Sequence, residues 1–397
     1  MRNKTVAQVL LILSPSLVLV ALAMDIIIPC IPAIASYFHT SSAVAQLVLS
    51  LYFVGTGIGQ IIIGPLADRF GRRKVILSSI LLFLVGSMIC AFANSILMLI
   101  VARFFEGVGA CGATVVSLAV IRDLFEDHTT PRAYSYVNSI VAMAPIFAPL
   151  LGGNMLEWFG TWRSCFYFVI LFGGLALIIN YLFLAETSPK SHPRHKLSKK
   201  SIVKNYKEIL KNKEFLSFTY CAAFGLSGLL LFFSISPILM INILEIAPGV
   251  YGYYFGFNFL VYLAGNMLSP KLQSKTSLVN VIQIGNIFIL LGAALMLWWH
   301  LQFGLSILAL MVPSVCLTFG VGLIYGPCMA GAMRPFKHLA GTASASYGAI
   351  IYCSSALIVA AIMLNEIENT MPFAIAMLIM GCINILITYA MAKRVKA

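Results

Sequence analysis

Apolar segments of about twenty residues recur twelve times along this chain, and that repetition limits the folds it can adopt. A helix of about twenty residues crosses the hydrocarbon core of a bilayer. The 397 residues are 60% hydrophobic and 10% charged, whereas about 25% of the residues of a soluble domain are charged. The sequence therefore predicts an all-α polytopic membrane protein. Its spans are expected at about residues 8–36, 44–66, 75–94, 97–122, 134–156, 164–185, 215–244, 249–270, 278–299, 303–327, 339–364 and 371–392.

The basic residues are distributed unevenly among the predicted loops. Of the 26 lysines and arginines, 24 fall in the two terminal tails and in the loops that follow even-numbered spans. This bias predicts that both termini are cytoplasmic. The net charge of +13 is then a topology signal and an attraction to anionic membrane lipid, not a sign of nucleic-acid binding. Four tryptophans at the predicted outer ends fit an interfacial aromatic belt: Trp158, Trp162, Trp298 and Trp299.

One polar interval, residues 186–214, divides the predicted spans into six and six. Its early Pro, Ser and Lys residues suit a flexible cytoplasmic linker, and its residues 202–210 are expected to form an amphipathic helix on the inner leaflet. The sequence thus predicts a first half at 1–185 and a second half at 215–397. Two such halves are typical of transporters with a site near the bilayer midplane. A channel or a membrane enzyme is less favoured.

The loop after the second predicted span reads GPLADRFGRRK and begins at Gly64. Gly71 allows a backbone angle that other residues avoid, and Asp68 can cap the start of a helix. This loop resembles the signature loop of the major facilitator superfamily of transporters. The resemblance implies that Asp68 faces the start of span 11 (AGTASAS) and that Arg72 pairs with Asp123, both contacts holding an outward-open state. The alternative is a solvated charged loop without a latch.

Other segments extend the resemblance. LIVARFFEGVGA, with Arg103, resembles the span-4 motif of the family, and APIFAPLLGG resembles the span-5 motif of its drug–proton antiporters. MDIIIPCIP, VIRDLF and AGTASAS narrow the resemblance to the bicyclomycin- and chloramphenicol-resistance branch of twelve-span antiporters. This resemblance implies a location in the inner membrane of a bacterium. In the family, the span-5 element packs against span 8 and is thought to limit leak. We favour a gating role over simple packing for its kinking prolines and close-packing glycines, which are Pro145, Pro149, Gly152 and Gly153.

Three residues carry a formal charge inside the predicted spans, clear of their ends: Asp25, Arg103 and Glu106. A charge at the membrane centre costs roughly 2.5 kcal/mol or more, so each is expected to have a partner or to face a water-filled cavity. A rise of about 1.5 Å per residue places Asp25 and Arg103 at similar depth in the outer half of the membrane. Glu106 shares a helix face with Arg103. We therefore expect a three-member cluster that faces the cavity between the halves.

The chemistry of such a cluster suits proton coupling. Burial raises the pKa of a carboxyl group, whereas a neighbouring arginine lowers it. Our hypothesis is that Asp25 is the principal proton carrier and that Arg103 sets its proton affinity. Glu106, at a position where the family motif normally has glutamine, would be a second carrier or a recognition site for a cationic substrate. The alternative is a static ion-pair network that holds spans 1 and 4 together.

The second half has no formal charge within its predicted membrane interior. A mostly apolar wall with a few polar groups suits a hydrophobic or amphipathic ligand. Its candidate ligand-contacting residues, each of which could instead serve packing alone, are Phe224, Phe232, Phe233, Tyr254, Asn258, Tyr347 and Tyr352.

The sequence therefore predicts a proton-coupled exporter of amphipathic compounds that works by alternating access. The alternative is a transporter of one metabolite or siderophore, which could be an importer, because fold does not determine substrate or direction. An enzyme is disfavoured, since the sequence has no metal-ligand spacing, nucleotide loop or nucleophile–base pair. We expect a monomer that uses the proton gradient and needs no cofactor or metal.

Overall fold

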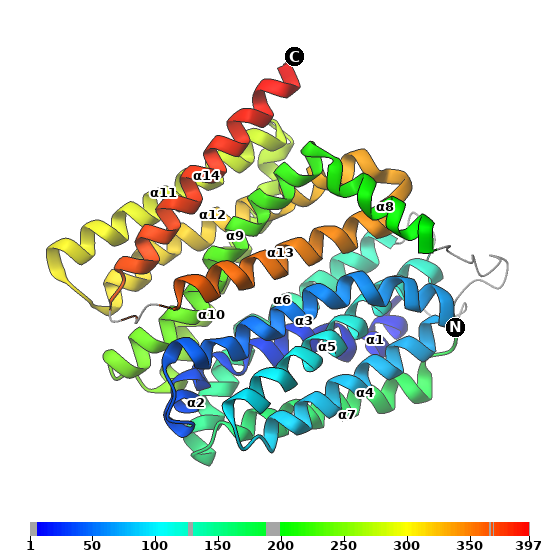
Figure 1. The fold of residues 1–397 in the computed structure, drawn as a ribbon, viewed down its shortest axis with the longest axis horizontal. Helices are drawn as coiled ribbons and strands as arrows, with labels where there is room; N and C mark the ends of the chain where they lie inside the picture. The colour runs from blue at the N-terminus through cyan, green and yellow to red at the C-terminus, as the bar shows by residue number, and fades with distance from the viewer. Residues whose placement is uncertain (1–5, 126–129, 188–198, 365–366, 368, 397) are drawn as a thin grey trace.

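A computed structural model describes residues 6–125, 130–187, 199–364, 367 and 369–396. In these ranges all regular secondary structure is helical, and the long helices lie side by side in one bundle (Figure 1). The predicted all-α fold class is confirmed. We call the end of the bundle that carries α8 the linker end, and the opposite end, which carries α2, the far end.

Each predicted span of the first half corresponds to one long helix or to a broken helix. These elements are α1 (Val6–Asp25), η1 (Ile28–Cys30) and α2 (Ile31–Tyr37), which together make the first span, then α3 (Ser42–Phe70), α4 (Arg72–Ala91), α5 (Ile96–Leu124), α6 (Thr130–Phe159) and α7 (Arg163–Phe183). The break in the first span follows from Pro29, which has no backbone N–H to continue an α-helical ladder.

The second half follows the same plan. Its elements are α9 (Lys213–Pro237) with the π-helical η2 (Ile238–Ile243), α10 (Pro248–Gln273), α11 (Leu278–Phe303), α12 (Ile307–Met333), the short η3 (Arg334–Leu339), α13 (Ala340–Ile362) and α14 (Met371–Lys396). The amphipathic helix expected in the linker is present as α8 (Lys199–Lys211). Part of the predicted linker, residues 188–198, lies outside the described residues.

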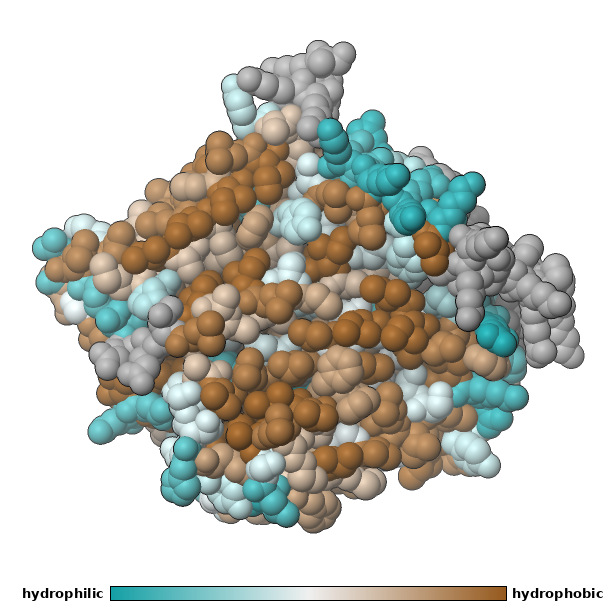
Figure 2. Space-filling model, in the orientation of Figure 1, coloured by the Kyte–Doolittle hydropathy of each residue, from teal (hydrophilic) through white to brown (hydrophobic). Residues whose placement is uncertain are grey.

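Eleven helices of the described ranges are long and apolar enough to cross a membrane. The predicted eighth span, α10, is absent from that set but is 26 residues long. It packs against α6 on one side and α12 on the other, so its small and polar residues lie within the bundle. Brown apolar side chains cover the middle of the visible face, and teal hydrophilic groups gather toward its ends (Figure 2).

The two halves meet along two pairs of helices, α6 with α10 and α3 with α13. At the far end, η1 also touches α9 and α10, and α2 touches η2. These contacts close the space between the two halves at the far end. The domain boundaries at residues 185 and 215 stay a prediction.

Candidate functional site

Asp25 is the last residue of α1, immediately before the break in the first span. Its side chain is buried, with 3% of its surface exposed. Among the described residues it makes neither an ion pair nor a hydrogen bond. An unpaired acid in a buried position is costly when ionised, so this position favours the protonated carboxyl group.

Arg103 and Glu106 of α5 form a fully buried ion pair, with Arg103 Nη1 2.7 Å from Glu106 Oε2. The guanidinium also donates to the carbonyls of Val48 (3.2 Å) and Ala23 (3.1 Å). It does not reach the carboxyl group of Asp25, which corrects the expected three-member cluster. The physical reason is that Arg103 meets α1 at Ala23, and side chains two positions apart on a helix do not face the same side.

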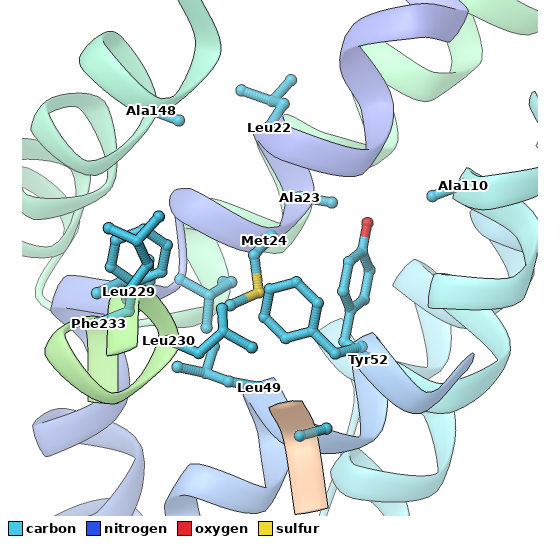
Figure 3. Packing of buried hydrophobic residues seen from close by; sticks show 14 of the residues in the cluster. Leu22, Ala23, Met24, Leu49, Tyr52, Ala110, Ala148, Leu229, Leu230 and Phe233 are labelled. Carbon is cyan, nitrogen blue, oxygen red and sulfur yellow. The ribbon is translucent and has the colours of Figure 1, made fainter. Parts of the chain in front are cut away.

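The surroundings of the pair lie within the first half. Glu106 accepts a hydrogen bond from Ser87 Oγ of α4 at 2.6 Å, and the Arg103 guanidinium lies 4.1 Å from the ring centroid of Tyr52. Figure 3 shows Ala23 on the side of α1 that faces Ala110, with Tyr52 close by. Glu106 therefore faces α4, not the second half.

Asp25 instead lies at the boundary between the halves. It lies within electrostatic range of Tyr52 of α3 and of Tyr251 of α10. Tyr251 shares a hydrogen bond of 2.8 Å with Ser236 of α9. Phe233, also of α9, lies beside the bend of the first span in Figure 3. Asp25 thus lies next to both halves, whereas the Arg103–Glu106 pair lies within the first half.

The predicted gate loop lies at the linker end. Arg72 Nε is 2.9 Å from Asp123 Oδ2, so the expected contact is present. It joins α4 to α5 within the first half and is formed while the far end is closed, so this conformation does not support its expected role of holding an outward-open state. Asp68 pairs with Arg72 at 2.7 Å and its side chain is 53% exposed. Among the described residues, Asp68 makes no contact with the start of α13 in this conformation, because Arg72, one helical turn away, holds the carboxylate. Gly64 has open space around its Cα.

Gly71 joins α3 to α4 with φ of +95°, a conformation that favours glycine. The carboxylate of Glu186, at the end of the sixth span, lies directly against it. Glu186 Oε1 accepts from the backbone N–H of Arg72 at 2.9 Å, and Oε2 accepts from that of Arg73 at 3.3 Å. Glu186, which is far from α4 in the sequence, therefore caps the start of that helix. Sequence reasoning missed this residue, although an acid directly after an apolar span was the available signal.

The predicted antiporter motif lies in α6, with Pro145 and Pro149 inside the helix. A Cβ on Gly152 would collide with the carbonyl of Ile26, and one on Gly153 with the carbonyl of Pro248. The motif thus makes the close approach to span 8 that the resemblance implied, and it also touches the residue that follows Asp25.

The candidate ligand residues of the second half divide into two groups. Phe232 and Phe233 pack on Phe255 at ring distances of 6.2 and 4.7 Å. Asn258 accepts from Ser314 Oγ at 3.0 Å and ties α10 to α12. Tyr254 of α10 is half-buried, and Phe224 lines an apolar groove of about 690 Å³ between α9, α13 and α14. These positions fit packing roles.

Tyr347 and Tyr352 of α13 form the second group. Tyr347 lies within electrostatic range of Tyr352, and also of Tyr262 in α10 and Tyr325 in α12, which sequence reasoning did not single out. The hydroxyl of Tyr347 is buried and has no hydrogen-bond partner among the described residues. Tyr352 stacks on Phe53 of the first half at 5.7 Å. Phenols from three helices therefore gather beside the α3–α13 contact.

Two packed halves of long apolar helices, with a buried and unpaired acid at their boundary, define this protein as a membrane transporter. The chain matches the sequence profile of the Major Facilitator Superfamily over residues 13–361. It belongs to that superfamily. The fold is also similar to that of a D-xylose–proton symporter crystal structure, with a TM-score of 0.77 and 15% identity over 97% of each chain.

Several of its curated relatives carry names from drug resistance. Multidrug resistance protein D of Escherichia coli is 26% identical and covers 94% of this chain and 93% of its own length. The bicyclomycin resistance protein homolog of Haemophilus influenzae is 26% identical, with coverages of 93% and 92%. A chloramphenicol resistance protein of Pseudomonas aeruginosa is 29% identical, with coverages of 86% and 80%.

Proposed function

We propose that this protein exports amphipathic drugs and similar small molecules in exchange for protons. The relatives named for resistance to structurally unrelated drugs support this substrate class. The distribution of Lys and Arg supports an inner-membrane position with the linker end in the cytoplasm. In that orientation the far end is the outer face, and the structure is a state closed to the outside.

The observation that carries the proposal is the position of Asp25. The acid is buried, unpaired and next to both halves, so its environment changes whenever the halves move. In this outward-closed state the neutral acid is favoured. Water that reaches it in another state favours the carboxylate, and the proton leaves or enters on the side where water has access.

The Arg103–Glu106 pair supplies the support for this acid. Arg103 holds the backbone of α1 at Ala23, two residues before Asp25. Because Glu106 balances its charge, Arg103 acts on Asp25 by positioning the end of α1. This role replaces the direct pairing of Arg103 with Asp25, and it agrees with the static-network alternative for Glu106.

The phenol group of α10, α12 and α13 supports an amphipathic substrate. Tyrosine presents an apolar ring and a polar hydroxyl, so it can contact ligands of varied chemistry. The hydroxyl of Tyr347, unpartnered within the described part of the chain, is a hydrogen-bonding group that a ligand could satisfy. No formal charge is required for such contacts, which suits binding of several unrelated compounds.

The first experiment tests Asp25 in proteoliposomes that hold a pH gradient. Several unrelated drugs are added to the wild-type protein and to Asp25→Asn, and proton movement is followed with a pH dye. We expect drug-dependent proton movement with the wild type and at least a roughly tenfold loss with Asp25→Asn, because asparagine cannot carry a proton. Asp123→Asn, the same change at the linker end, should slow transport but keep it proton-coupled. Unchanged coupling in Asp25→Asn would refute the assignment.

The same assay distinguishes the alternative function. Proton movement with several unrelated drugs supports drug export, whereas a response to one metabolite or siderophore alone supports a single-substrate transporter. A family fold admits both. The proposed protein works as a monomer, with protons, lipid and a small-molecule substrate as its partners.

A further inference from the structure

Helix α10 begins without a cap of its own. Ala247 precedes it and makes no side-chain capping bond, and Pro248 lacks an N–H. The N–H of Gly249 instead donates to Glu157 Oε1 at 2.8 Å. Glu157 belongs to α6, so an acid from the first half caps a helix of the second half. The partial positive charge of a helix start favours such an anion.

A second bond crosses the boundary deeper in the bundle. Gln46 Nε2 of α3 donates to the backbone carbonyl of Ser234 in α9 at 2.5 Å. Gln46 is 1% exposed, and its Oε1 atom is buried without a partner among the described residues. Ser234 precedes the irregular end of α9, where the Ile238 N–H donates to Ile235 instead of four residues back. The disturbed helix end therefore meets a donor from the other half.

We propose that Glu157 and Gln46 form a far-end latch, a pair of hydrogen bonds that hold the outer face closed and break in each transport cycle. Their partners, Gly249 and Ser234, lie on helices of the second half. Any motion that separates the halves at the far end breaks both bonds. The inference rests on the exchange between two states that the proposed function requires, but not on the identity of the proton carrier.

The linker end carries similar parts, an acid of the first half and a helix start of the second half. Leu339, at the start of α13, makes no side-chain capping bond, and Asp68 of the first half is largely exposed. An acid of one half and an uncapped helix start in the other therefore occur at both ends. In this structure the far-end set is engaged, whereas among the described residues Asp68 pairs only with Arg72. Only one of the two sets would be engaged in each state.

The test measures the populations of the two states without drug or proton gradient. Spin labels placed across the boundary at the far end report the separation of the halves in lipid nanodiscs. We expect Glu157→Gln to raise the outward-open population about threefold to tenfold, because the neutral amide interacts less with the helix start. Gln46→Leu should raise it further, because it leaves the buried carbonyl of Ser234 unpaired.

Glu245→Gln is the matched control. Glu245 is an exposed acid between η2 and α10 on the same face, and within the described ranges it has no hydrogen-bond partner. It should leave the populations unchanged. Unaltered distances in both latch variants, or an equal shift in Glu245→Gln, would overturn the latch. Because neither drug nor gradient is present, this outcome is independent of the Asp25 experiment.

Discussion

Arg103 and Glu106 neutralise each other inside the first half, where either charge alone would be costly. Two charges three positions apart on one helix share a face, so their pairing follows from the sequence. Whether Asp25 joins them depends on how α1 is rotated against α5, and no local pattern contains that rotation. The sequence therefore predicted the three residues and one of the two contacts, while the position of Asp25 at the boundary required tertiary packing.

At this scale we predict unequal effects of removing either partner of the pair. Arg103→Met leaves a buried carboxylate without its cation and should lower the stability by about 3–5 kcal/mol. Glu106→Gln keeps an oxygen that can accept from Arg103 and should cost less. Thermal unfolding of the purified protein in detergent measures both. Equal melting temperatures for the two variants would contradict the pairing as the source of stability.

The long helices are the part of the structure that the sequence predicts best. Runs of apolar residues predict each long helix to within a few residues of its ends, because a membrane span must satisfy its backbone internally. The features that were not predicted depend on contacts between distant segments. Glu186 capping α4 is one example, and the π-helical end of α9 beside Gln46 is another.

The α3–α4 turn allows a sharp test of that cap. Gly71→Ala places a methyl group against Glu186 and forces alanine into a φ of +95°, so stability should fall by about 1–3 kcal/mol. Gly64→Ala is the control from the same motif, since nothing lies within 4 Å of its added Cβ. It should be neutral or slightly stabilising. Thermal unfolding distinguishes them, and an equal loss in both would argue against the cap.

The uneven distribution of charge orients the whole molecule in the membrane. The linker end carries the excess of Lys and Arg, and the four tryptophans lie near the opposite ends of α6, α7 and α11. Such asymmetry orients a membrane protein during insertion. The arrangement of the halves at α6–α10 and α3–α13 could not be predicted from charge or hydropathy, because both describe single helices and not their neighbours.

We predict that the linker end faces the cytoplasm. Single cysteines replace Asn94, in the α4–α5 connection at the far end, or Ser274, after α10 at the linker end, in a chain whose own cysteines are substituted. A membrane-impermeant maleimide should label intact cells carrying Asn94→Cys and should label Ser274→Cys only after lysis. The reverse pattern would invert the proposed direction of transport.

The adjacent glycines of α6 have a consequence for how such an exporter can evolve. Gly152 rests on Ile26, next to the acid, and Gly153 rests on Pro248 of the opposite half. Neighbouring positions of α6 therefore contact the segment that follows Asp25 and the second half. An added methyl group at Gly152 would press on the segment that follows Asp25, and one at Gly153 would press on the second half. Substitutions at these two positions therefore alter the two contacts separately.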